Sequence, residues 1–192
     1  MKEANIYLCG VGGQGIGMLS EVLIRACMEA GYDVMGCDTH GLAQRGGVVQ
    51  SHLRIGEHIY TPLVPDGEAD IVIALERLEA MRGALEMLRE GGSVIYYNTT
   101  YQPMRVRSGA MQYPSQSDVE ETVKKLNGNL HAVELEGLPD PRMQNVALLG
   151  RLAELELIEG LNAAVIRSVL KSVLPEHVLE KNLEVFSRAS NS

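Results

Sequence analysis

Cysteine is scarce in this chain of 192 residues, which contains only Cys9, Cys27 and Cys37. Their wide spacing excludes the C-x-x-C pairs of zinc sites and the four-cysteine run of a ferredoxin-type cluster. Cys9 lies in an apolar run and Cys27 on the apolar side of a predicted helix, so both are expected to be buried as small hydrophobes. Cys37 is the only one that we would test for reactivity. The sequence therefore predicts no metal and no iron–sulfur centre in this chain.

Basic residues are also few. The 17 Lys and Arg against 25 Asp and Glu give a formal net charge of −8, which argues against a nucleic-acid groove. No stretch approaches the roughly 20 apolar residues that span a bilayer, and the N-terminus lacks the pattern of a secretory signal. We expect a cytoplasmic protein with no nucleic-acid or membrane partner. Its length and 45% hydrophobic content suit one core, so we interpret residues 1–192 as a single domain.

The first half of the chain alternates between apolar runs and helical periodicity. An apolar run over 4–9 precedes a helix that ends at Gly31, and a second run covers 33–38. This strand–helix–strand pattern predicts that the first two strands are parallel neighbours. The segment 48–55 alternates apolar and polar residues, as a half-exposed strand does, whereas 70–75 is apolar throughout, as in a strand covered on both faces.

The second half continues this alternation and ends in helices. A helix over about 76–89 is expected to bury Leu78, Met81, Leu85 and Leu88. Together the elements predict an α/β fold, a Rossmann-like three-layer sandwich with a mostly parallel sheet and C-terminal helices. The other elements expected are a strand at 94–97, a helix capped by Ser117 and Glu120, a strand at 130–135, a helix begun by Asp140 and Pro141, and helices after Asn162 and Pro175.

Between the first strand and the first helix lies a glycine-rich turn that fits the G-x-G-x-x-G pattern of dinucleotide-binding proteins. Glycines allow positive φ angles and close approach of a ligand, and a helix N-terminus offers free N–H groups to a phosphate. Asp38, which ends the second strand, is placed where a ribose-binding acid would be. A turn kept for helix–sheet packing, or for a partner's ligand, accounts for the same pattern. The candidate residues of this turn are Gly10, Gly12, Gly13, Gln14 and Gly15.

A second glycine-rich segment, 38–47, lacks hydrophobic periodicity and gathers polar side chains among glycines. It follows the second strand, so we expect a loop at the same sheet edge as the first turn. Arg45 can bind a carboxylate or phosphate and His40 can exchange a proton, although each also suits an ordinary surface loop. We hypothesise that the two loops together form a functional site. The candidates here are His40, Gln44, Arg45, Gly46 and Gly47.

The remaining polar residues give weaker signals. Asn145 and Asn182 each lie among apolar neighbours, which favours buried structural amides over catalytic ones. The histidines other than His40 have no metal-ligand spacing, and no Ser or Cys nucleophile stands in a G-x-S-x-G elbow. We therefore assign no catalytic residue and no metal ligand to this chain.

Three motifs in order resemble the beta subunit of indolepyruvate:ferredoxin oxidoreductase. They are Gly10–Gly15, His40–Gly47 and Ala74–Arg82. This subunit belongs to the gamma-subunit family of pyruvate, ketoisovalerate and other 2-oxoacid:ferredoxin oxidoreductases. Asn145–Gly150 and Lys181–Phe186 also look like that family, so the resemblance covers nearly the full chain.

The resemblance implies a cofactor-poor subunit of an enzyme that decarboxylates a 2-oxoacid oxidatively, transfers the acyl group to coenzyme A and reduces ferredoxin. It also implies that thiamine diphosphate, magnesium and iron–sulfur clusters belong to a larger partner subunit, and that this chain alone binds no cofactor and is inactive. The short chain and the His40–Gly47 pattern favour an arylpyruvate such as indolepyruvate, with a branched-chain or other 2-oxoacid still open. The two glycine loops would then line the surface facing the partner's active site or coenzyme A.

Two other interpretations stay open at this point. A stand-alone nucleotide-binding reductase built on the first glycine turn would bind a nicotinamide or flavin tightly by itself. A purely structural docking subunit would use its loops only to hold a partner. The oligomeric state is not readable from the sequence, so a homo-oligomer of the isolated chain is also open.

Overall fold

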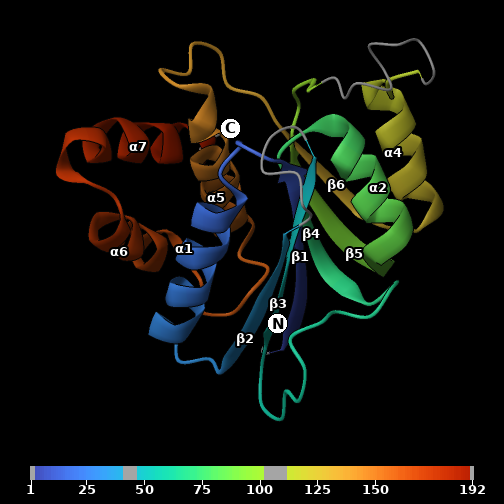
Figure 1. Cartoon of the computed structure of the whole chain (residues 1–192), viewed down its shortest axis with the longest axis horizontal. Helices are drawn as coiled ribbons and strands as arrows, with labels where there is room; N and C mark the ends of the chain where they lie inside the picture. Colours follow the sequence, from blue (N-terminus) through green and yellow to red (C-terminus); the bar gives the residue numbers. More distant parts are fainter. Residues whose placement is uncertain (1–2, 41–46, 102–111, 191–192) are drawn as a thin grey trace.

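A computed structural model of the chain describes residues 3–40, 47–101 and 112–190, with Thr39 and His40 described by their backbone alone. Its centre is a six-stranded sheet with helices on both faces, which confirms the predicted three-layer α/β fold (Figure 1). The strand order is β2-β3-β1-β4-β5-β6. The strands are β1 (Ala4–Val11), β2 (Val34–His40), β3 (Val48–Ile55), β4 (Ala69–Ala74), β5 (Leu88–Tyr97) and β6 (Asn129–Val133).

The sheet is mostly parallel, but one strand breaks the pattern. β1, β4, β5 and β6 pair in parallel, whereas β3 is antiparallel to both β1 and β2. The prediction that the first two strands are neighbours is therefore wrong, because β3 lies between them. Only residues 41–47 join β2 to β3, and so short a connection suits antiparallel neighbours and not a parallel crossover.

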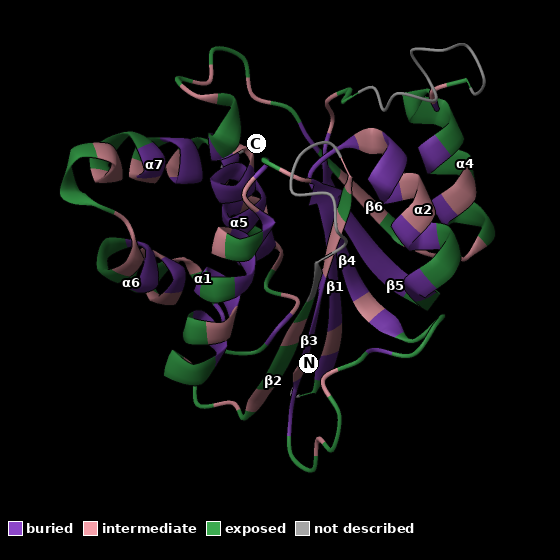
Figure 2. Cartoon of the chain, viewed as in Figure 1, coloured by how far each residue is buried: buried purple, intermediate pink, exposed green. Residues whose placement is uncertain are grey.

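Helices cover the two faces of the sheet unequally. On one face lie α1 (Ile16–Glu29) and α5 (Gln144–Leu155), with α6 (Ala163–Val173) and α7 (Glu176–Ala189) packed against them. The other face carries α2 (Arg77–Met87) and α4 (Gln116–Lys125). Buried residues line the sheet and the inner sides of these helices (Figure 2). Among the described residues, no helix is long and apolar enough to span a membrane.

Several helix starts follow the predicted capping residues. Asn162 caps α6, and Asp140 accepts the backbone N–H of Arg142 at the start of the 3-10 turn η1 (Pro141–Met143), which continues into α5. The capping box of α4 was predicted two residues too late. It is formed by Ser115 and Asp118, so that Ser117 already lies inside the first turn.

The buried face of α2 also differs from the prediction. Leu78 is buried as predicted, and Leu88 is buried too but belongs to β5. Leu85 is 64% exposed, and the helix buries the small residues Ala80 and Gly83 instead. A Cβ added to Gly83 would lie 2.9 Å from Val72 Cγ1, so the helix approaches the sheet closely at this glycine. Close contact of the small residues with the sheet turns the Leu85 side outward.

Candidate functional site

The two glycine-rich segments meet at the carboxyl edge of the sheet. β1 and β3 pair through Val11 and Val48, and the next backbone contact is a hydrogen bond of 2.9 Å from Gly12 N–H to the Gly47 carbonyl oxygen. The expectation that both loops lie at one edge therefore holds for Gly47. Of the other predicted loop residues, Gln44, Arg45, Gly46 and the side chain of His40 lie outside the described part of the chain.

Gln14 holds the first glycine turn in place from within. Its buried side chain accepts the Val11 N–H at Oε1 over 2.7 Å and donates from Nε2 to the Leu75 carbonyl oxygen over 3.1 Å. The chain leaves β1 toward α1 on one face and β4 toward α2 on the other, so Gln14 bridges the point where the connections diverge. Such switch points are where open α/β sheets bind ligands.

The glycines of this turn meet different structural needs. Gly13 and Gly15 have φ angles of 102° and 88°, in the left-handed region that favours glycine. A Cβ on Gly15 would also lie 2.6 Å from Asn145 Nδ2, and a Cβ on Gly10 would lie 3.0 Å from Leu75 Cβ. Close packing therefore explains Gly10 and Gly15 without any ligand.

Asn145 and Asn182 are both buried, as predicted for structural amides. Asn145 donates from Nδ2 to the Gly15 carbonyl oxygen over 3.3 Å and so connects the start of α5 to the start of α1. Asn182 donates to the Val178 carbonyl oxygen within α7. Their positions in the first turn of α5 and the middle of α7 make Asn145 part of the site's framework and leave Asn182 away from it.

A small pocket opens beside the first glycine turn. Its volume is about 200 Å³. The wall consists of the glycine turn, the segment after β5 and the start of α5, with Tyr101 45% exposed. The guanidinium of Arg142 is held by the Asp140 carboxylate, which it contacts at 2.6 Å. The lining residues are Gly13, Gln14, Thr99, Tyr101, Pro141, Arg142 and Gln144.

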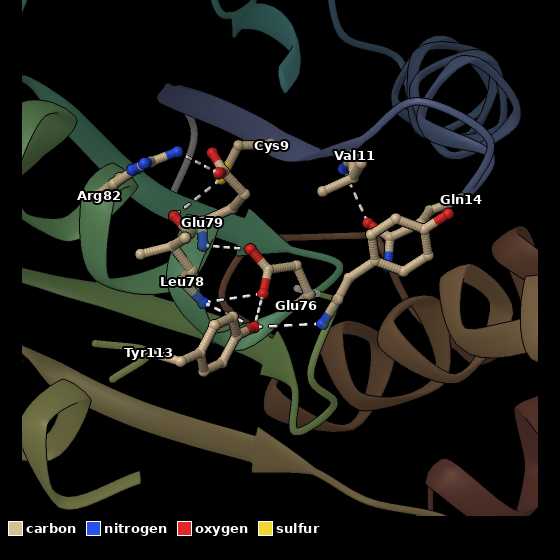
Figure 3. A network of polar contacts seen from close by, with 9 residues as sticks. Cys9, Val11, Gln14, Glu76, Leu78, Glu79, Arg82 and Tyr113 are labelled. Atoms are coloured by element: carbon tan, nitrogen blue, oxygen red, sulfur yellow. Dashed lines mark hydrogen bonds and ion pairs between the residues drawn. The ribbon is translucent and has the colours of Figure 1, made fainter. Parts of the chain in front are cut away.

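A fully buried carboxylate, Glu76, lies directly after β4 next to Leu75 (Figure 3). It caps α2, because Oε1 accepts the Glu79 N–H over 2.7 Å and Oε2 accepts the Leu78 N–H over 2.9 Å. The Tyr113 hydroxyl also donates to Oε2. Burial raises the pKa of Glu76, and the hydrogen bonds from Tyr113, Leu78 and Glu79 oppose that rise.

A second buried carboxylate, Glu79, lies one turn along α2. Its Oε1 accepts from Arg82 over 2.7 Å, and its backbone carbonyl oxygen receives the Cys9 thiol at 3.4 Å. Burial raises the pKa of Glu79 to about 7, against the opposing effect of Arg82, and the neighbouring Glu76 adds to the rise. Burial also raises the pKa of the Cys9 thiol, which leaves it a protonated structural residue, as predicted.

Asp38 does not lie where a ribose-binding acid would. Its carboxylate accepts the Ser51 hydroxyl over 2.5 Å and the Ser20 hydroxyl over 3.4 Å. In the sheet Asp38 pairs with Ser51 of β3, so a whole antiparallel strand separates it from β1 and the glycine turn. The placement expected for a dinucleotide site is absent from this part of the sheet.

The described residues do not suit a metal or cluster site. They contain no group of three or more Cys, His, Asp or Glu side chains that could hold a metal ion. Cys9 packs in the core beneath α2 and α4, whereas Cys27 packs in the core beneath α1 and α5, so the sheet separates the two thiols. Cys37 is partly exposed on the edge strand β2.

Sequence reasoning missed the residues Glu76, Glu79, Tyr101, Tyr113 and Arg142 as parts of the site. The motif Ala74–Arg82 contained the signal that could have pointed to Glu76, because this acid follows directly on an apolar strand. A glutamate at that point is an unusual helix cap, because shorter side chains are preferred there. Nothing in the sequence pattern places Tyr101 or Tyr113 near it.

Comparison with known proteins gives a consistent result. Residues 5–192 match the family described as pyruvate ferredoxin/flavodoxin oxidoreductase. Indolepyruvate oxidoreductase subunit IorB of Pyrococcus horikoshii is 33% identical over 191 residues, which cover 97% of this chain and 94% of that protein. The protein of the same name from Archaeoglobus fulgidus is 42% identical over 122 residues, or 64% of this chain and 60% of that protein.

Solved structures show the same fold. Pyruvate oxidoreductase subunit PORC of Thermotoga maritima is similar with a TM-score of 0.69 and 22% identity, over 100% of this chain and 97% of that one. A 2-oxoglutarate:ferredoxin oxidoreductase from Magnetococcus marinus, with 2-oxoglutarate, coenzyme A and succinyl-CoA bound, also gives a TM-score of 0.69 at 21% identity. This chain spans only 31% of that longer polypeptide.

Proposed function

The chain belongs to the pyruvate ferredoxin/flavodoxin oxidoreductase family, and on this premise we propose that it is the small, cofactor-poor subunit of a 2-oxoacid:ferredoxin oxidoreductase in the cytoplasm. The favoured substrate is an arylpyruvate such as indolepyruvate, which is decarboxylated oxidatively to an acyl-CoA while ferredoxin is reduced. The observation that carries the proposal is the near full-length relationship to indolepyruvate oxidoreductase subunits at 32–33% identity.

The cofactors are assigned to a larger partner subunit. Thiamine diphosphate with magnesium supplies the decarboxylation chemistry and iron–sulfur clusters carry the electrons. The described residues contain no group of Cys, His, Asp or Glu side chains that could hold a metal ion or a cluster. The thiols of Cys9 and Cys27 lie on opposite faces of the sheet, and burial raises the pKa of both. No step of the reaction is therefore assigned to a cofactor on this chain.

In the proposed complex, this chain contributes the carboxyl edge of its sheet, where the two glycine-rich loops lie. The loops Gly10–Gly15 and His40–Gly47 line the surface that faces the partner's active site or coenzyme A. Two observations support this placement: Gly12 and Gly47 are in direct contact, and the pocket between Gly13 and Tyr101 opens at the same edge. The rest of the edge would be completed by the partner subunit.

A stand-alone nucleotide-binding reductase fits the geometry less well. Packing explains Gly10 and Gly15. Asp38 lies on β2, which is not next to β1 in the sheet, and its carboxylate is bound to Ser51 of β3. The first turn therefore lacks, at the position expected for Asp38, the acid that hydrogen-bonds the ribose of a dinucleotide. The other alternative is a docking subunit without any role at the substrate. Turnover of loop variants in the assembled complex distinguishes this alternative from the main proposal.

The substrate assignment is tested with a panel of 2-oxoacids. The chain is combined with its larger subunit, and coenzyme A-dependent reduction of ferredoxin is measured with indolepyruvate, phenylpyruvate, a branched-chain 2-oxoacid and pyruvate. The proposal predicts the highest kcat/KM for an arylpyruvate. A preference for the branched-chain acid or pyruvate would contradict the assignment of substrate while leaving the subunit role intact.

A further inference from the structure

The Tyr113 hydroxyl connects three separate parts of the chain. It donates to Glu76 Oε2 and accepts the backbone N–H of Tyr101 over 3.3 Å and that of Leu78 over 3.4 Å. A tyrosine hydroxyl has one proton to donate and two lone pairs, so all of its hydrogen-bonding capacity is used here. Figure 3 shows the Tyr113 hydroxyl beside Glu76 and Leu78 at the start of α2.

Tyr101 lies between this contact and the pocket. It is 45% exposed and lines the pocket together with Gly13 and Gln14. Its backbone N–H is held by Tyr113, and Tyr113 is held by a carboxylate that is itself completely buried. The position of the Tyr101 wall is therefore tied to the start of α2.

The use of glutamate at position 76 needs an explanation beyond helix capping. Ser, Thr, Asp and Asn cap helices well, and burying a carboxylate is costly unless several hydrogen bonds stabilise it. The longer glutamate side chain reaches the Leu78 and Glu79 amides and also receives Tyr113. The same residue follows Leu75, whose carbonyl oxygen accepts from Gln14, another residue that lines the pocket. Two pocket-lining residues, Gln14 and Tyr101, are thus tied to the short segment of Leu75 and Glu76.

We propose that Glu76 and Tyr113 are a pair of positioning residues that hold Tyr101 in the wall of the pocket, where Tyr101 contacts one of the two small substrates, the 2-oxoacid or coenzyme A. This inference rests on the proposed function, because the pocket serves turnover only if its edge faces the active site of the complex. Tyr113 and Glu76 act through Tyr101 and do not touch the substrate themselves.

The proposal is tested first on the isolated full chain. Tyr113→Phe removes the hydroxyl and with it the hydrogen bond to Glu76 Oε2. Among the backbone amides that donate to this hydroxyl, Leu78 N–H keeps its bond to Glu76, so Tyr101 N–H is the amide that loses its partner. We expect faster amide hydrogen exchange at Tyr101 in this variant and no change in Tyr60→Phe, whose side chain is 87% exposed. Unchanged exchange at Tyr101 would overturn the positioning role, whatever the enzyme's activity.

The second test is a double-mutant cycle in the reconstituted complex at saturating partner subunit. Tyr101→Ala and Tyr113→Phe are each expected to raise the KM for the same substrate several-fold, and the double variant is expected to match Tyr101→Ala alone. The inference would be overturned if the two substitutions raised KM independently, so that their factors multiply in the double variant. It would also be overturned if the variants lost only affinity for the partner subunit, or if neither KM changed. A wild-type mixture without 2-oxoacid-dependent reduction would instead overturn the proposed function, and with it the substrate contact.

Discussion

The Gly12 N–H donates a hydrogen bond to the Gly47 carbonyl oxygen over 2.9 Å, and this contact joins the two glycine-rich segments of the chain. It extends the antiparallel pairing of β1 with β3 by one step beyond Val11 and Val48. The turn after β1 is therefore held on one side by the entry to β3 and on the other by Gln14 and the end of β4.

The three glycines around the start of α1 should respond differently to alanine. Gly13→Ala puts a side chain in the left-handed region with open space around it, and should lower the free energy of unfolding by about 1 kcal/mol. Gly15→Ala adds a clash with Asn145 Nδ2 and should lose roughly 2–4 kcal/mol. Urea unfolding of each variant measures the difference.

Gly17→Ala is the matched control for this series. Gly17 lies inside α1, and a Cβ there would meet nothing within 4 Å. Alanine should therefore leave stability unchanged or raise it by up to about 1 kcal/mol. Equal losses at positions 15 and 17 would contradict the role assigned to the contact between Gly15 and Asn145.

Gln14 is expected to matter for stability and for turnover. Gln14→Ala leaves the Val11 N–H and the Leu75 carbonyl oxygen without their partner at a buried position, at a cost of about 1–3 kcal/mol. Because the side chain also lines the pocket, activity of the assembled complex should fall even where the variant is fully folded. Thermal unfolding and steady-state kinetics on the same preparations check both parts. Normal activity in a destabilised variant would confine Gln14 to the scaffold.

Glu79 should make stability depend on pH. Its pKa is raised to about 7 by burial, so the folded state holds this proton between about pH 4.5 and 7 while the unfolded state has lost it. The stabilising effect of the protonated form is present in full below pH 4.5 and is lost as the pH rises toward 7. The free energy of unfolding should therefore fall by at most about 3 kcal/mol across this window.

Glu79→Gln tests this assignment, because a neutral amide has no proton to lose. The variant should show a flatter dependence on pH between 4.5 and 7, although Glu76, whose pKa is also raised by burial, retains its share of the slope. Glu180→Gln, at an exposed position of α7, should leave the wild-type slope unchanged. Denaturant unfolding at several pH values gives all three curves, and identical slopes for wild type and Glu79→Gln would refute the prediction.

Gln44 and Arg45 are expected to act in the complex and not in the isolated chain. Gln44→Ala and Arg45→Ala should reduce oxoacid-dependent turnover at saturating partner concentration while leaving the unfolding midpoint of the lone chain unchanged. Arg25→Ala is the control, since Arg25 is exposed on α1 and forms an ion pair with Glu21 of the same helix. If neither loop substitution alters assembly or turnover, the loops do not face the active site.

The sequence pattern was sufficient to predict most of the fold. Apolar runs located β1 and β4, the alternation of apolar and polar residues located β3, and Asp140 and Asn162 identified the starts of two helices. The order of strands was mispredicted because periodicity records which residues are apolar and not which strand lies beside which. The short connection after β2 favours antiparallel pairing of β2 with β3, and this pairing puts β3 between β1 and β2.

The site was predictable only in part. Glycines between a strand and a helix indicate a turn at the edge of the sheet, and the first turn lies there. Gly47 was predicted to lie at the same edge, and it contacts Gly12. The Glu76–Tyr113 contact joins residues 37 positions apart through side chains, and no local pattern reports such a pairing. His52 shows the same limit, because it lies on the polar side of an alternating strand but is buried where Val64 N–H donates to its Nδ1.

The most direct test of the central claim is a titration of the larger subunit with this chain. Arylpyruvate-dependent reduction of ferredoxin is measured at each ratio, alongside binding of nicotinamide and flavin to the lone chain. The account predicts activity only in the mixture, rising to a plateau at a fixed subunit ratio, and no tight binding of either nucleotide by the lone chain. Turnover or tight nucleotide binding by this chain alone would contradict it.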